Sequence, residues 1–214
     1  ISINNKKSFK TIYKKEKTIN NPASNLPYEK FDEFLNDNIF LIEKDLKKLI
    51  KKFNLIIKSE KYVQKQISIK QNKHKKMISQ KRLNYLLNEA KNQCKKSIQE
   101  KKIIHMLIDN YLIDNKNFTH LPDQRKCRSF SLDVSFICLQ ISLVEKFEQI
   151  LKKYQISLNQ ILDANYIESF FNEEDMDVFN MGNKIINGFN RNEVKMISKK
   201  IEKRGLFERF FNLF

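Results

Sequence analysis

The C-terminal residues of the chain have the types and spacing needed to bind a lipid surface. At about 100° per residue on an α-helix, the apolar residues of segment 206–214 share one face. Glu208, Arg209 and Asn212 share the opposite face. A short aromatic face is typical of a helix that lies in a membrane interface, with its rings at the acyl boundary. The residues of this face are Leu206, Phe207, Phe210, Phe211, Leu213 and Phe214.

Four cations precede this apolar face, and Gly205 separates the two as a hinge. The cations are Lys199, Lys200, Lys203 and Arg204. Their position favours contact with anionic head groups. The segment is too short to span a bilayer, because a transmembrane helix needs about 20 apolar residues. We therefore predict a peripheral membrane contact through these ten residues, and the alternative is a terminal helix docked on the protein's own core.

The net charge also favours anionic partners. The 214 residues carry a formal charge of +16, which suits phospholipid surfaces, nucleic acid or acidic proteins. The densest basic run, residues 70–82, could bind phosphate groups of nucleic acid or lipid, and the alternative is a solvated loop and helix start. Aromatic residues do not interleave with this run, as they do in many single-strand readers. Nucleic acid is therefore the alternative partner, after the membrane.

Other residue types argue against an enzyme. The three glycines, Gly182, Gly188 and Gly205, are isolated, so none of the glycine-clustered loops that cradle phosphate can be formed. The cysteines are Cys94, Cys127 and Cys138, without a CxxC pair, which predicts buried thiols in a reducing compartment rather than a zinc site. The chain opens on polar, basic sequence without the apolar core of a signal peptide. We expect no cofactor and no metal.

The histidines and carboxylates do not form a catalytic set in the sequence. His105 lies in an apolar run, where a single histidine is usually a hydrogen-bonded core residue. Alternation along the following strand puts Asp133 and Cys138 on opposite faces, so the two side chains cannot act together with His105. We predict no catalytic residue and a non-enzymatic protein.

Hydrophobic periodicity outlines the elements that would position these residues. Strict alternation of apolar and polar residues predicts a half-buried strand over 129–138. A helix begins after Ser79, which is placed as its N-cap. The remaining expected elements are a helical stripe over 28–53, a strand over 62–69, a buried strand over 103–113, a helix over 143–154 and a short strand and turn over 157–171.

The order strand–helix–strand–strand–helix predicts an α+β fold, in which a small sheet has its helices on one face. The expected organisation is a flexible basic arm (1–27), an α+β interaction domain (28–170), a linker with a small helix (171–204) and the C-terminal amphipathic helix (205–214).

Several short motifs resemble one protein family when they are taken in order. Ile78-Ser79-Gln80 opens a helix, Ile103-Ile104-His105-Met106 forms a strand, and Tyr111-Leu112-Ile113-Asp114 closes it. A loop with Leu121-Pro122-Asp123, the strand Leu132-Asp133-Val134 and the helix over 143–154 follow. This order is similar to the strand–helix–strand–strand subdomain that is inserted in the bacterial cell-division protein FtsA. That family also ends in a short amphipathic membrane-targeting helix.

The resemblance covers about residues 40–165 and the C-terminal segment. It implies an interaction subdomain that contacts neighbouring subunits and other cell-division proteins, held at the cytoplasmic face of a bacterial inner membrane. ATP binding and the site for the FtsZ tail are not carried over, because the glycine-rich loops and the flanking subdomains are missing. The expectation is a non-enzymatic FtsA-like adaptor that binds division proteins and copies of itself. The alternative is a basic RNA- or ribosome-associated binding module.

Overall fold

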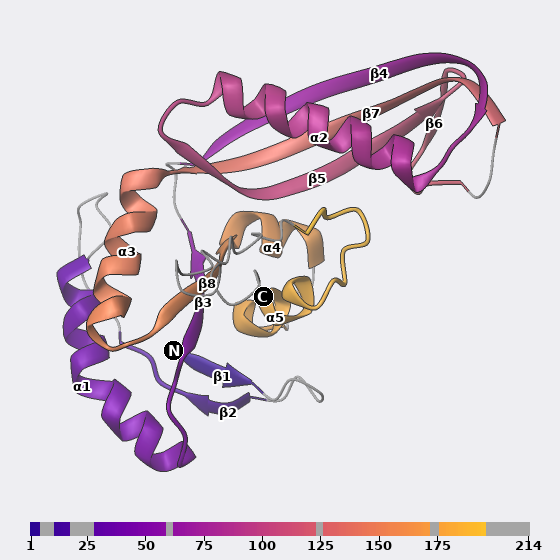
Figure 1. The fold of residues 1–214 in the computed structure, drawn as a ribbon. Helices are drawn as coiled ribbons and strands as arrows, with labels where there is room; N and C mark the ends of the chain where they lie inside the picture. Colours follow the sequence, from indigo (N-terminus) through magenta and orange to yellow (C-terminus); the bar gives the residue numbers. More distant parts are fainter. Residues whose placement is uncertain (5–10, 18–27, 59–61, 123–125, 172–175, 196–214) are drawn as a thin grey trace, which may run out of the picture.

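A computed structural model of the chain describes residues 1–4, 11–17, 28–58, 62–122, 126–171 and 176–195, with the backbone alone for 72–76 (Figure 1). Within these ranges helices and strands alternate along most of the chain. They are β1 (Ser2–Asn4), β2 (Thr11–Lys14), α1 (Tyr28–Leu46), β3 (Lys52–Ile57), β4 (Val63–Met77), α2 (Gln80–Ser97), β5 (Lys101–Ile113), β6 (Lys116–Phe118), β7 (Lys126–Gln140), α3 (Ile141–Lys153), β8 (Ser157–Asp163), α4 (Ala164–Phe171) and α5 (Val178–Ile186).

Strands β4 to β7 and helix α2 form one unit, which we call the insert. Its antiparallel sheet has the strand order β4-β7-β5-β6, and α2 covers one face (Figure 1). The alternation predicted for β7 is confirmed, because every second side chain from Phe130 to Cys138 is buried while Ser131, Asp133 and Ser135 are half-buried. The buried set packs against Leu86 of α2 and its helical neighbours.

Helix α2 begins where the sequence predicts. Ser79 has extended backbone angles, and its hydroxyl accepts a hydrogen bond from the backbone N–H of Arg82 at 3.3 Å. Such a cap satisfies one of the N–H groups that a helix start leaves without a partner. Leu83, Leu86 and Cys94 then follow at helical spacing and are buried against the sheet. The cap and the apolar stripe together fix the helix over the insert.

The remaining elements form a second unit, which we call the base. Strands β3 and β8 pair in parallel, with α1 and α3 on one side and α4 and α5 on the other (Figure 1). Successive side chains of β3 point to opposite sides, so Ile57 packs with α3 whereas Ile56 packs with α5. A Cβ on Gly182 of α5 would lie 2.7 Å from the Ile56 side chain. Glycine therefore lets α5 lie close to β3.

The structure confirms the α+β class but not the arrangement of a single sheet with two helices on one face. The helix predicted over 143–154 forms as α3, yet it leaves the insert and packs in the base. The reason is that its apolar stripe, with Val144 and Phe147, matches Ile57 of β3 and Ile161 of β8. Residues 157–171, expected as a short strand and turn, form β8 and the helix α4.

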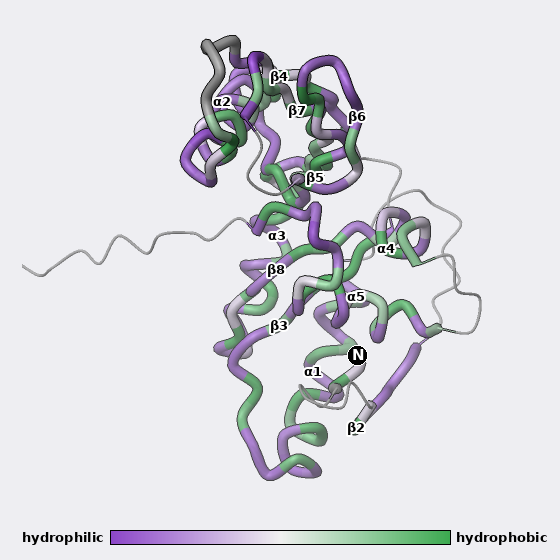
Figure 2. The backbone as a smooth tube through the Cα atoms, turned by 90° about the vertical axis from the view of Figure 1, so that its right-hand side faces the viewer, coloured by the Kyte–Doolittle hydropathy of each residue, from purple (hydrophilic) through white to green (hydrophobic). Residues whose placement is uncertain are grey.

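The insert interrupts the sequence of the base at one position, between β3 and α3. The chain leaves the base after β3, runs through the whole insert, and returns through α3 to β8 beside β3. The far face of the insert sheet contacts the base, because Ile104, Leu107 and Ile137 pack with the helices α4 and α5. The two units therefore share a core at this joint. In the hydropathy view the apolar residues of β8 and α4 lie next to this end of the insert (Figure 2).

Part of the predicted basic arm has structure. Residues Ser2–Asn4 and Thr11–Lys14 pair as the antiparallel strands β1 and β2. Ile1 packs against the cluster around Leu35 of α1, and the ammonium of Lys14 lies 3.7 Å from the carboxylate of Asp177. The described residues of the arm therefore contact the base rather than extend away from it.

Candidate functional site

The ten residues predicted to contact a membrane lie outside the described part of the chain. They are Lys199, Lys200, Lys203, Arg204, Leu206, Phe207, Phe210, Phe211, Leu213 and Phe214. The membrane site therefore stays a prediction. No helix among the described residues is both long enough and apolar enough to cross a membrane.

Arg82, the last cation of the basic run, is a core residue. Its side chain is almost fully buried at the start of α2, and the guanidinium lies over the Phe130 ring at 5.7 Å. Its Nε donates to Gln71 at 3.1 Å and its Nη1 donates to the carbonyl of Met77 at 3.3 Å. This guanidinium stabilises the end of β4 and is not exposed to a phosphate ligand.

A cavity lies between the insert and the base. This groove has a volume of about 550 Å³ and is bordered by the end of α2, the start of β5, α3, β8 and the residues after α5. Isoleucine, leucine and valine side chains form its floor, including Ile103, Ile161 and Ile185. Its charged rim consists of Lys91, Lys95, Lys101, Lys102, Lys195, Glu148 and Glu193.

The groove runs along the edges of two strands. Residues 158–162 of β8 and 101–104 of β5 all line it. Because successive side chains of a strand point to opposite faces, consecutive residues line one cavity only where the cavity follows the strand edge. Among the described strands, none pairs with the edge of β8 that faces away from β3, or with the outer edge of β5 at 101–104. Both edges can therefore accept another strand.

Positive charges outnumber negative charges among the residues that line the groove. Lys102 forms an ion pair with Glu148 at 3.4 Å. The carboxylate of Glu193 lies 2.7 Å from Nδ1 of His105. Within the described residues, the other four lysines of the rim have no carboxylate at ion-pair distance. Four cations beside an apolar floor favour an anionic ligand that also has apolar groups.

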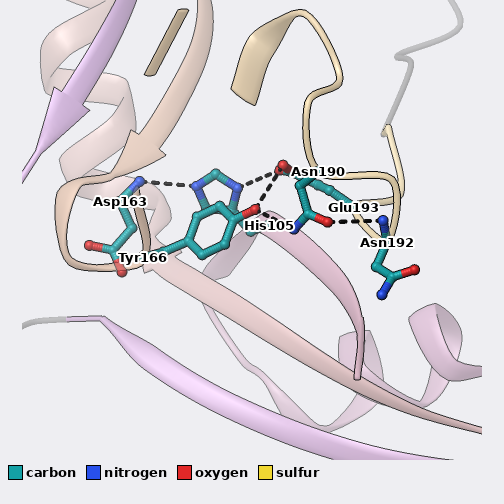
Figure 3. A network of polar contacts seen from close by, with 6 residues as sticks. All are labelled: His105, Asp163, Tyr166, Asn190, Asn192 and Glu193. Atoms are coloured by element: carbon teal, nitrogen blue, oxygen red, sulfur yellow. Dashed lines mark hydrogen bonds and ion pairs between the residues drawn. The ribbon is translucent and has the colours of Figure 1, made fainter. Parts of the chain in front are cut away.

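A buried network of polar side chains connects the two units (Figure 3). One of its members, Glu193, also lines the groove. The Nε2 of His105 accepts a hydrogen bond from the backbone N–H of Asp163 at 3.0 Å. Its Nδ1 lies 2.7 Å from a carboxylate oxygen of Glu193 and donates to it. Tyr166 donates to the other oxygen of that carboxylate at 3.1 Å, and the Tyr166 and His105 rings are 4.6 Å apart. The network joins β5 of the insert to β8 and α4 of the base.

The same geometry assigns a structural role to His105. Since the N–H of Asp163 occupies Nε2, the proton of the neutral ring is on Nδ1, and neither ring nitrogen is left for a substrate. Burial raises the pKa of the Tyr166 phenol, which therefore keeps its proton and acts as a donor. Burial also raises the pKa of Asp163, whose carboxylate accepts from the backbone N–H of Asn165 at 3.1 Å. The prediction of a hydrogen-bonded core histidine is confirmed.

A short segment after α5, residues 190–194, holds the insert against the base, and we call it the strap. Its backbone pairs with the edge of β5, where Ile108 N–H donates to Asn192 and Val194 N–H donates to Met106, both at 2.9 Å. The amide of Asn190 donates to the Tyr166 hydroxyl at 2.8 Å (Figure 3). The strap therefore uses the edge of β5 immediately beyond the part that lines the groove.

The groove was not among the predicted sites. Its lysines come from α2, from β5 and from the residue after the strap, so they are up to 104 positions apart in the sequence. The one local signal is the pair Lys91 and Lys95, whose i, i+4 spacing puts two cations on one side of a helix. Compared with protein-family models and with curated proteins, the chain gives no match.

Proposed function

We propose that this chain is a non-enzymatic adaptor that binds an extended, acidic segment of a partner protein in the groove between the insert and the base. The observation that carries this proposal is the combination of two open strand edges with a lysine rim. An added strand gains main-chain hydrogen bonds along such an edge, and side chains of alternate residues provide specificity. Apolar side chains of the ligand fit the floor at Ile103 and Ile161, and its carboxylates fit the rim.

The class of adaptor is proposed from the resemblance to FtsA. In support, the insert lies between β3 and the α3–β8 segment, which agrees with a strand–helix–strand–strand subdomain inserted in a larger body. The predicted C-terminal helix would hold the protein at the cytoplasmic face of a bacterial inner membrane. Its partners would then be other cell-division proteins. Imaging of a fluorescently tagged full chain tests this part, because the proposal expects a midcell band, and a nucleoid or ribosome pattern would contradict it.

The groove is tested by peptide binding to the full chain. A fluorescein-labelled octapeptide of alternating Glu and Val should bind with saturable anisotropy, whereas an octapeptide of alternating Lys and Val should not. A Glu–Val peptide with N-methylated backbone should bind weakly, because strand addition needs its N–H groups. Equal binding of all three peptides would contradict the proposal.

Two neighbouring lysines of α2 offer a matched pair of variants. Lys95 lines the groove, and Lys96, also exposed, does not. Lys95→Glu should weaken binding of the acidic peptide by about tenfold, since it replaces an attraction with a repulsion of roughly 1 kcal/mol or more. Lys96→Glu changes the net charge equally, so its smaller effect separates a local contact from general attraction. Equal effects of both variants would exclude the groove as the peptide site.

A further inference from the structure

Three phenylalanines form an aromatic patch on the base, in which Phe170 and Phe189 are exposed and Phe171 is half-buried. Phe170 and Phe171 end α4, and Phe189 follows α5. The rings of Phe170 and Phe171 pack edge to face with centroids 5.1 Å apart, and Phe189 lies 5.4 Å from Phe171 and 6.4 Å from Phe170. Despite these contacts, Phe189 is 60% exposed and Phe170 is 38% exposed. We call these three residues the aromatic patch.

Packing keeps the patch in place but leaves it accessible. The ammonium of Lys184 lies 5.3 Å from the Phe171 ring centroid and 5.4 Å from that of Phe189, a geometry that holds both rings by cation–π attraction. The ring of Tyr166, a member of the buried network, packs against the Phe170 ring, with ring centroids 6.2 Å apart. Clustered exposed aromatics on a rigid support are a typical contact surface.

The chain itself carries a complementary segment within reach. The strap begins directly after Phe189, and the residue that follows it, Lys195, lies close to the neighbour of Phe189, since its Nζ would be 3.1 Å from a Cβ on Gly188. Ten residues, 196–205, then separate Lys195 from the apolar segment 206–214, and an extended chain of that length reaches about 35 Å. A tethered segment has a high effective concentration at a surface that its linker can reach, so it outcompetes a free partner of equal affinity.

We propose that the aromatic patch is the intramolecular docking site of segment 206–214, so that one apolar face binds either the patch or a membrane. The docking half stands on the patch and the tether. The membrane half rests on the proposed function. In the docked state the segment is withheld from lipid, and contact with an anionic bilayer releases it.

The absence of tryptophan from the chain makes a direct test possible. Phe210→Trp places a single reporter in the segment. Without lipid, its emission should be blue-shifted and poorly quenched by iodide. Adding Phe170→Ser and Phe189→Ser should shift the emission towards that of Trp in water and increase the quenching constant several-fold. Phe40→Ser is the matched control, because Phe40 is a 72% exposed aromatic on α1, away from the patch, and it should change nothing.

A reciprocal pair guards against a patch variant that does not fold. Phe189→Trp puts the reporter in the patch, and Phe207→Ser with Phe211→Ser then removes its partner without touching the base. Iodide quenching should rise in this variant as well. Equal quenching with and without the partner substitutions in both series would overturn the proposal. Emission that changes on dilution would also overturn it, because docking would then occur between copies of the chain.

Sedimentation with anionic vesicles separates the two halves of the proposal. If the segment binds lipid, the patch variant should bind phosphatidylglycerol vesicles several-fold more tightly than wild type, while Phe40→Ser matches wild type. If the patch variant frees the Trp reporter but neither protein binds vesicles, docking is supported and the membrane part of the proposed function fails. Wild type and patch variant that bind vesicles with the same affinity would overturn the competition.

Discussion

The substitution His105→Phe tests whether the buried network holds the insert and the base together. Phenylalanine keeps the ring and its contact with Tyr166, whose centroid lies 4.6 Å away, but it removes both hydrogen bonds of the imidazole. The backbone N–H of Asp163 then has no acceptor at 3.0 Å, and Glu193 loses the donor at 2.7 Å. His105 is 1% exposed, so water cannot replace it freely.

The expected loss of stability follows from the two bonds. An unsatisfied buried N–H costs about 1–3 kcal/mol, and a lost hydrogen bond to a charged acceptor costs about 1.5–3 kcal/mol. Since Glu193 keeps the Tyr166 hydroxyl and is 15% exposed on its side chain, we take the lower half of the second range. The free energy of unfolding should therefore fall by about 2.5–5 kcal/mol.

Urea denaturation followed by far-UV circular dichroism measures this change. His120→Phe is the matched control, because His120 is exposed and hydrogen-bonds only its neighbour Thr119, and it should stay within about 0.5 kcal/mol of wild type. Hydrogen exchange adds a local readout, since the amide of Asp163 should lose protection before the amides of β7 do. A His105→Phe protein within about 1 kcal/mol of wild type would refute the role of the network as a joint.

Three further predictions concern other contacts. Tyr154→Phe removes hydrogen bonds from the phenol to Asp32, one of them to the carboxylate at 2.8 Å, and should lower the free energy of unfolding by about 1 kcal/mol in urea. Burial, and next the hydrogen bond to the Asp32 carboxylate, raise the pKa of Tyr154 to about 12. The stability that this hydrogen bond contributes should therefore be present below about pH 10 and be lost as the pH rises through 12. The carboxylate of Asp114 accepts hydrogen bonds from the backbone N–H groups of Ser129 and Arg128, and these bonds lower its pKa. The Asp114→Asn protein should therefore be less stable than wild type at pH 7. The urea midpoints of the two proteins should converge as the pH falls below about 4. In vesicle sedimentation, Phe207→Asp with Phe211→Asp should release the protein from anionic lipid, and equal pelleting would remove segment 206–214 from the membrane contact.

Local patterns in the sequence predicted the insert well. The alternation in β7, the serine cap of α2 and the apolar run of β5 each depend on neighbours within one element, so period and cap chemistry were sufficient. Asp133 and Cys138 lie on opposite faces as predicted, with Asp133 accepting from Ser68 across the sheet at 2.6 Å.

The base and the groove depend on partners that are distant in sequence. Apolar residues of α3 fit any apolar surface, and only the pairing of β3 with β8 shows that the base, not the insert sheet, covers them. The partner of His105, Glu193, is 88 positions away, and no pattern in the sequence connects them. The predicted membrane residues remain a prediction because they lie outside the described ranges.

The position of the insert in the sequence, between β3 and β8, has a consequence for the order of folding. Pairing β3 with β8 directly would close a loop of roughly a hundred residues, and closure entropy grows by about 0.6 kcal/mol for each doubling of loop length. Once β4 and β7 pair, Val63 lies opposite Cys138, and only roughly 25 residues of open chain remain in that loop. Two halvings lower the barrier by about 1.2 kcal/mol. The insert should therefore nucleate the molecule, and mutations in β4 or β7 should slow the folding of the whole chain, whereas mutations in β8 should mainly speed its unfolding.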